Sequence, residues 1–442
     1  MKRLLTIIAA LLLSISMIFA NGSQEAKSAE SDDGLSGTIT MIAMANQAKG
    51  LNAAFDEYQK DHPNVNLDIV VANTVTDFET MMTTYIAANE LPDMYLNQVG
   101  AVQQSYAAEG YLMPITDIGV MDKIIDGDKE LISWQGDYYA VPMGTTMNVI
   151  IVNNAVLKEA GINIGEDNYP KCWSDFIDLC DQLVAAGVQY PVTVAGKDSS
   201  SITAWPFQYI YQTIYGEDPN WYANMLRGEH AWNDELYLSM FDKYAEMKKY
   251  ISPSALGNDV NGMYRAFISG ESPILFQVAN TVGAIRDIAP DLDIICLPSC
   301  FTDDPADQTI IAGLDSGLSI CSTTEIPEVC ISFMQYLVSD EGSTIYAENA
   351  QEIPTTRVNH AKVDPSYTLC LKILQEGQLP VSPVLSRQWI PGIKEIMKTA
   401  SQNWFAGADA KVVCDEIQAQ HDRLVAANPE WVQNFLDTYI EK

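Results

Sequence analysis

The chain has 442 residues, more than a single hydrophobic core usually spans, so we expect two lobes. Apolar residues make up 48% of it and charged residues 19%, a balance that is typical of folded soluble proteins and excludes a disordered chain. With 58 acidic and 25 basic residues the net charge is −33, which excludes nucleic acid and anionic membranes as partners, because phosphate recognition needs clustered Lys and Arg. We interpret the acidity as a source of solubility.

Residues 1–20 have the pattern of a signal peptide. Lys2 and Arg3 precede an apolar run over 4–13, and Ile18-Phe19-Ala20 provides a cleavage site. The run is too short for a transmembrane helix, and no cysteine near the cleavage site would carry a lipid anchor. We expect an exported, periplasmic protein, in which residues 21–36 form a disordered leader rich in Ser, Gly and acidic residues.

The first part of the mature chain alternates between strand and helix patterns. A helix with Leu51, Phe55 and Tyr58 on one face ends before Pro63, and Thr76-Asp-Phe-Glu79 is a capping box that opens another helix. Such alternation favours a parallel sheet with helices on its faces. The predicted strands are 37–44, 65–71 and 93–96, and the predicted helices end near 62, 89 and 108.

Residues 137–154 contain two β-rich runs, 138–141 and 147–152, that we expect to be separate strands. Pro142 cannot donate to a sheet ladder, and Gly144 tolerates backbone angles that other residues avoid. A strand that breaks and resumes in this way indicates a crossover between two sheets, with Thr145 on the floor of a cleft between two lobes. The alternative is an ordinary hairpin or bent strand in one domain, which these residues alone favour.

The remaining chain is predicted as a mixture of short strands and helices. Ser174 is expected to cap a helix that runs to Ala186, and residues 201–215 are dense in aromatic side chains. Further helices are predicted at 153–160, 234–250, 260–268, 281–288 and in most of the chain after 327, and strands at 191–195, 273–278, 292–297, 309–312 and 318–321.

Signatures of catalysis, cofactor binding and metal binding are absent from the sequence. There is no Gly-x-Gly-x-x-Gly, no Walker-type phosphate loop and no Gly-x-Ser-x-Gly elbow. The four histidines (62, 230, 360 and 421) are dispersed in polar contexts, so we expect them at the surface. The eight cysteines form no Cys-x-x-Cys pair, which indicates core thiols and no zinc site. Paired catalytic carboxylates would be invisible among so many acids, so an exported glycan hydrolase stays an alternative.

Two features point to a sugar ligand. The flat faces of Trp and Tyr suit the C–H face of a sugar ring, although core packing is the simpler explanation for any one of them. Amide side chains can both donate to and accept from hydroxyl groups. Several amides follow predicted strands, at the edge of the sheet where α/β proteins bind ligands. Turn capping would explain these amides as well. The aromatic candidates are Trp205, Trp221, Trp232 and Trp389, and the amide candidates are Asn46, Gln47, Asn97, Gln98 and Asn280.

Several motifs, taken in order, resemble the family 1 extracellular solute-binding proteins, which serve carbohydrate importers of the ATP-binding cassette (ABC) type. The resemblance covers nearly the whole mature chain. The motifs are Gly37-Thr-Ile-Thr40, Leu91-Pro-Asp-Met94, Gly110-Tyr-Leu-Met-Pro-Ile115, Gly136-Asp-Tyr-Tyr-Ala-Val-Pro142, Cys172-Trp-Ser-Asp-Phe176, Phe267-Ile-Ser-Gly-Glu271, residues 313–320 and Phe333-Met-Gln-Tyr-Leu-Val-Ser-Asp-Glu341. Asp315 and Ser316 depart from the small residues that are more usual in the family, so the substrate does not transfer.

The resemblance implies an α/β, two-lobed periplasmic-binding-protein fold of type II kind, with a hinge and an interlobe cleft. It places the first lobe at 37–143 plus 308–355 and the second at 147–305 plus 360–442. A monomer without catalysis or cofactor would hold a sugar or oligosaccharide in the cleft and deliver it to a membrane permease; a binder of another small solute, such as a polyamine, is the alternative. The implied ligand residues are Trp205 and Trp389 for stacking, and Asn46, Asn97, Gln98, Thr145, Asn280 and Asp315 for hydroxyl groups.

Overall fold

The computed structural model describes residues 34–73, 75–125, 129–197, 212, 214, 218–384 and 387–439. The predicted signal peptide, most of the leader and Trp205 lie outside these residues. Within them, the alternation predicted for the first part of the chain is confirmed. Strand β1 (Gly37–Met44) pairs in parallel with both β2 (Val65–Ala72) and β3 (Met94–Gln98). Between and after these strands come helices α2 (Ala45–Asp61), α3 (Val75–Ala88) and α4 (Ala101–Ala108).

Helix α2 shows why this sequence forms a helix that covers the sheet. Leu51, Phe55 and Tyr58 are buried on one face, at the spacing that a 3.6-residue period requires. The ring of Phe55 meets Phe333 of α12 (Pro327–Leu337) edge-on, with ring centroids 5.3 Å apart. Aromatic pairs of this geometry contribute about 0.5–1.5 kcal/mol beyond the area that they bury.

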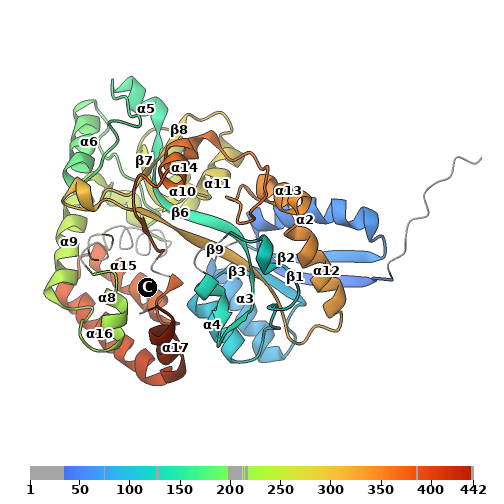
Figure 1. Cartoon of the computed structure of the whole chain (residues 1–442). Helices are drawn as coiled ribbons and strands as arrows, with labels where there is room; N and C mark the ends of the chain where they lie inside the picture. Colours follow the sequence, from blue (N-terminus) through green and yellow to red (C-terminus); the bar gives the residue numbers. More distant parts are fainter. Residues whose placement is uncertain are drawn as a thin grey trace, which may run out of the picture.

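Two long strands, β6 (Val141–Asn153) and β9 (Ile310–Ile320), cross the molecule side by side (Figure 1). At one end β9 pairs with β3, and at the other end β6 pairs with β7 (Ile274–Val278) and β8 (Ile294–Pro298). The resulting sheet has eight strands, in the order β2-β1-β3-β9-β6-β7, with β8 also on β6 and β10 (Val381–Ser382) on β9. The predicted crossover between two separate sheets is therefore wrong, because β6 runs from one half of a single sheet to the other.

The predicted interruptions of these strands are wrong. Residues 141–153 form one strand, and so do residues 310–320, each of which we predicted as two short strands or runs. The β6–β9 register shifts between Pro142 and Gly144 and again between Gly144 and Thr145. Such an irregularity accommodates a proline without ending the strand, because the residue that lacks an N–H sits where the ladder is already broken.

The other half of the molecule is built mainly from helices that surround β7, β8 and the far end of β6 (Figure 1). Two helices after β9, α12 and α13 (Asp340–Ala350), return to the first half and pack near α2. The remaining helices are α5 (Asn154–Glu159), α6 (Trp173–Ala185), α8 (Trp221–Leu226), α9 (Glu235–Met247), α10 (Val260–Ile268), α11 (Thr281–Ile288), α14 (Thr368–Gln375), α15 (Ile393–Phe405), α16 (Ala410–Ala427) and α17 (Pro429–Tyr439), and β4 (Ser133–Trp134) and β5 (Asp137–Tyr138) form a small hairpin.

Two local predictions in this half need correction. Residues 191–195 form no strand in the described structure, where Val192 makes only isolated bridges. The N-cap of α6 is Cys172, not Ser174. The carboxylate of Asp175 accepts a hydrogen bond from the Cys172 backbone N–H at 3.3 Å, so the helix is capped two residues earlier than predicted.

The apolar side chains form two buried clusters. The smaller cluster lies in the first half and contains Phe55, Leu318 and Phe333. The larger cluster extends through both halves: it surrounds Phe176 in the second half and includes Phe78 and Tyr95 on the opposite face of the first half. The two clusters therefore lie on opposite faces of the sheet in the first half, and the larger one continues into the second half.

The prediction for the cysteines is confirmed, whereas the prediction for the histidines fails at one position. All eight cysteines are described, buried and free, which confirms that they are core thiols. The expectation of surface histidines is wrong for His421, which is 1% exposed because α16 packs it against the rings of Tyr222 and Trp232, each 6.0 Å away. Within the described ranges, none of the helices combines the length and apolar character needed to cross a bilayer.

Candidate functional site

Charged and amide side chains from both halves of the molecule converge where β3 ends beside β9. Gln98, the last residue of β3, pairs with Ser316, and the N–H of Val99 donates to the backbone oxygen of Asp315 at 3.1 Å. Backbone pairing within the sheet therefore holds the end of β3 against Asp315 and Ser316 of β9. We call the set of side chains around it the polar junction, which consists of Asn46, Gln98, Asn280, Asp315, Glu352, Arg387 and Lys394.

A buried ion pair lies at the centre of the polar junction. Arg387, which precedes α15, forms it with Asp315 of β9, and their side chains are 3% and 9% exposed. The amide of Asn280, before α11, donates to the other carboxylate oxygen of Asp315 at 3.3 Å. The Nε of Arg387 has no hydrogen-bond partner among the described residues. A buried pair of this kind adds little net stability, but the loss of one partner leaves an uncompensated charge.

Glu352, just after α13, supplies the second buried carboxylate. Its Oε1 accepts from the amide of Asn46 at 3.1 Å, whereas its Oε2 finds no partner in the described structure. Burial, and to a lesser extent the nearby negative charge of Asp315, raise the pKa of Glu352 well above its usual value. The polar junction thus holds a buried carboxyl oxygen for which no hydrogen-bond partner is found among the described residues.

Gly144 allows the Glu352 carboxyl group to lie against the crossing strand. A Cβ atom at Gly144 would lie 2.5 Å from Oε2 of Glu352. The backbone of Gly144 does not have a positive φ, so the predicted reason for a glycine here, unusual backbone angles, is wrong. The glycine is required for close approach instead.

Lys394 connects the second half of the molecule to the first. It lies in the first turn of α15, and its Nζ donates to Oε1 of Gln98 at 3.0 Å. Burial, together with the positive charges of Lys398 and Arg387, lowers the pKa of Lys394 to about 7.

The structure brings together four of the predicted ligand residues. Asn46, Gln98, Asn280 and Asp315 all belong to the polar junction. Asn97 is 6% exposed and directly precedes Gln98 on β3. Thr145 is half-buried on β6, and its backbone N–H donates to Ile353 at 2.8 Å.

The tryptophans lie in a buried aromatic cluster of the second half. Trp221 and Trp232 are 1% and 0% exposed, as the simpler explanation of core packing requires. Trp389 is 3% exposed, and its ring meets Trp232 edge-on at 5.5 Å. Its ring is therefore part of the packing in this structure, and its role in stacking stays a prediction.

Three members of the polar junction were missed by the sequence analysis. Glu352 is one acid among 58, and no local pattern distinguishes it. Arg387 stands two residues before Trp389, and Lys394 follows five residues later. A cluster of basic residues in so acidic a chain, next to a predicted ligand residue, is the signal that could have identified these two.

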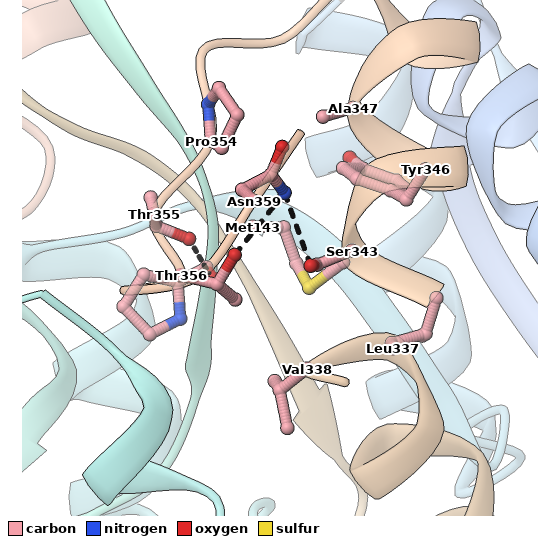
Figure 2. Close-up of a pocket in the computed structure, with 11 residues that line it drawn as sticks. Met143, Leu337, Val338, Ser343, Tyr346, Ala347, Pro354, Thr355, Thr356 and Asn359 are labelled. Carbon is pink, nitrogen blue, oxygen red and sulfur yellow. Dashed lines mark hydrogen bonds between the residues drawn. The ribbon is translucent and has the colours of Figure 1, made fainter. Parts of the chain in front are cut away.

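A small pocket in the first half shares no residue with the polar junction (Figure 2). It is lined by residues of β6, α12 and α13 and by the loop that carries Thr356 and Asn359, and its volume is about 10 Å³. The amide of Asn359 spans it, donating to Ser343 at 3.1 Å and to Thr356 at 3.2 Å. This volume fits about one water molecule and excludes a sugar. Among the described residues, no group of three or more His, Cys, Asp or Glu side chains could hold a metal ion.

Comparison with known proteins identifies relatives of the same architecture. The family model described as "Bacterial extracellular solute-binding protein" matches residues 44–344. The melibiose/raffinose/stachyose-binding protein MelE of Bacillus subtilis is 22% identical over 354 residues, which are 78% of this chain and 79% of that protein.

Solved structures show the same fold at low identity. A chitin oligosaccharide binding protein superimposes with a TM-score of 0.77 at 18% identity, over 88% of this chain and 99% of that one. A sugar transporter protein from Bacillus licheniformis, in complex with stachyose, gives 0.73 at 18% identity, over 88% and 100%. These likenesses confirm the predicted two-lobed α/β fold. Because the family model covers more than half of its length, the chain belongs to the family of bacterial extracellular solute-binding proteins.

Proposed function

We propose that this protein captures a sugar or oligosaccharide at the polar junction and delivers it to the permease of an ABC importer, without chemical turnover. The observation that carries the proposal is the convergence of polar side chains from both halves on the crossing strands. Asn46 and Glu352 come from the first half, whereas Asn280 and Arg387 come from the second. The names of its relatives, which include raffinose- and stachyose-binding proteins, favour a sugar over other solutes.

The chemistry of the polar junction suits a ligand rich in hydroxyl groups. A hydroxyl group both donates and accepts, so one such group could accept from Nε of Arg387 and another donate to Oε2 of Glu352. Both atoms are buried and unpartnered in the described structure, and each such atom costs about 1–3 kcal/mol. A ligand that satisfies them recovers this cost, so their arrangement favours binding.

The remaining predicted residues are part of the proposal. Thr145 would contribute from β6, Asn97 from β3, and Trp205 and Trp389 would stack on sugar faces. We also propose the lobe boundaries 37–143 plus 308–355 and 147–305 plus 360–442. The position of the register shifts near Gly144 supports them.

Contacts between the halves support a closing motion around the ligand. Besides the bond from Lys394 to Gln98, Nζ of Lys49 on α2 lies 2.5 Å from Asp287 of α11. Ligand contacts that exist only when such bridges are made would shift the population toward the closed form. A permease would recognise that form, and export to the periplasm by the predicted signal peptide would place the protein at the membrane.

A thermal-shift assay of the purified protein tests the function. The panel contains neutral and uronate-containing mono- to tetrasaccharides together with polyamines. We expect at least one sugar to raise the melting temperature, since a ligand at a hundredfold its Kd stabilises the native state by about 2.7 kcal/mol. The sugar should be recovered intact by chromatography after prolonged incubation. Stabilisation by polyamines alone, by no member of the panel, or with conversion of the sugar to products would overturn the proposal.

A further inference from the structure

We propose that the sugar bound at the polar junction carries a carboxylate, which pairs with Lys394 and with the free Nε–H of Arg387. The proposal rests on the proposed function, because it specifies the class of ligand that the same site takes. It predicts a preference for uronate-containing sugars over neutral sugars of the same size.

The first observation is the concentration of positive charge at one place in an acidic protein. Only 25 of the 442 residues are Lys or Arg, yet Arg387, Lys394 and Lys398 lie within twelve positions of one another. Two of them already have carboxylate partners: Arg387 pairs with Asp315, and Lys398 pairs with Glu395. Lys394 forms no ion pair within the described residues, and its neutral partner is the amide oxygen of Gln98.

The second observation is that the two cations converge on one corner of the sheet. Gln98 and Asp315, their partners, lie on adjacent strands, one position apart in the β3–β9 pairing. The backbone of Arg387 also touches the turn after β3, since a Cβ atom at Gly100 would lie 2.2 Å from the Arg387 carbonyl oxygen. The segment from Arg387 to Lys394 therefore lies across the end of β3, where the hydroxyl-binding amides are also found.

The third observation is electrostatic. An ammonium group that has lost water and faces two other cations is unfavourable, which is why the pKa of Lys394 falls to about 7. The carboxylates of Glu79 and Glu395 raise the pKa of Lys394, but by less than the charges of Lys398 and Arg387 lower it. The N-cap of α15 is Gly392, which has no side chain to cap the helix, so the helix dipole adds to the positive potential at the same point, with Glu395 of the first turn opposing it. A carboxylate on the ligand would supply the missing counter-charge, whereas a neutral sugar would not.

Titration calorimetry with matched sugars tests the preference. Di- and trisaccharides that contain galacturonate, glucuronate or mannuronate are compared with their neutral counterparts of the same linkage and length. We expect at least one uronate to bind at least tenfold more tightly than its neutral counterpart. Its affinity should fall between 0.05 and 0.5 M NaCl, since the interaction is between charges, while that of the neutral sugar stays constant.

Variants separate charge recognition from a structural role of the lysine. Lys394→Gln should remove the preference for the uronate, so that the variant binds the uronate and its neutral counterpart with affinities within about twofold of each other. The matched control is Lys411→Gln on the exposed surface of α16, which should change neither. Equal or tighter binding of neutral sugars by the unmodified protein would overturn this inference and leave the proposed function standing. Failure of both kinds of sugar to bind would overturn the proposed function itself.

Discussion

Substitution of Glu352 by Gln should change how the stability of the protein depends on pH. The carboxyl group is 2% exposed, accepts one hydrogen bond from Asn46 and lies against the backbone of Gly144. Gln preserves the shape and can still accept from Asn46, but it cannot carry a charge. The substitution therefore isolates the cost of ionising a buried acid.

The sign and size of the effect follow from the raised pKa of Glu352. Its ordinary pKa is 4.5, and burial raises it well above this value in the folded protein. Between the two values the folded state holds a proton that the unfolded state has lost. The free energy of unfolding of the wild-type protein therefore falls by about 1.4 kcal/mol per pH unit across this window, relative to the Glu352→Gln variant. Gln should thus be increasingly favourable as the pH rises from 4.5.

Urea unfolding followed by tryptophan fluorescence measures this difference. Wild type and Glu352→Gln are compared at pH 5, 6 and 7, together with Glu416→Gln, which changes an exposed acid on α16. We expect the difference in unfolding free energy between wild type and Glu352→Gln to grow with pH, while the control stays parallel to wild type. Parallel curves for all three proteins would show that Glu352 ionises normally, and the account of the polar junction would be wrong.

Three further substitutions test separate parts of the structure. Arg387→Met should lower the free energy of unfolding by about 3–5 kcal/mol in a urea titration, because Asp315 is left buried without its partner. A change below about 1 kcal/mol would indicate that the pair is exposed to solvent. Gly144→Ala should cost about 1–3 kcal/mol, since the new Cβ meets Glu352 at 2.5 Å, and an unchanged melting temperature would contradict that close approach. Burial lowers the pKa of His421 from 6.5 to about 4. Between these pH values the unfolded state binds more protons than the folded state. The free energy of unfolding of the wild-type protein should therefore fall by about 3 kcal/mol as the pH drops from 6.5 to 4. A His421→Leu variant should lose this dependence, and an equal loss in both proteins at pH 4.5 would refute the assignment.

Regular local patterns made much of the fold predictable. The bounds predicted for β1, α10 and α11 are those observed, because the hydrophobic pattern of a buried strand or an amphipathic helix lies within its own residues. The crossing strands were harder. Pro142 and Gly144 normally interrupt a strand, and only the pairing of β6 with β9, distant in sequence, shows that a register shift absorbs them.

The candidate site was predictable only where it follows the sheet. Gln98 and Asn280 stand at strand ends, a position that the topology of α/β proteins marks for ligands. Glu352, Arg387 and Lys394 follow no such rule. They reach the site because α13 and α15 are carried there by long-range packing, so their partners could not be inferred from neighbours in the sequence.

The most direct test of sugar capture at the polar junction is calorimetric titration of the best ligand from the panel against site variants. Asn46→Ala and Asn280→Ala each remove an amide that lies at the junction, and Asn349→Ala on the exposed side of α13 is the matched control. We predict that each junction variant binds the sugar at least tenfold more weakly than wild type and that the control binds it equally. Unchanged affinity in both junction variants would place the ligand elsewhere and contradict the account.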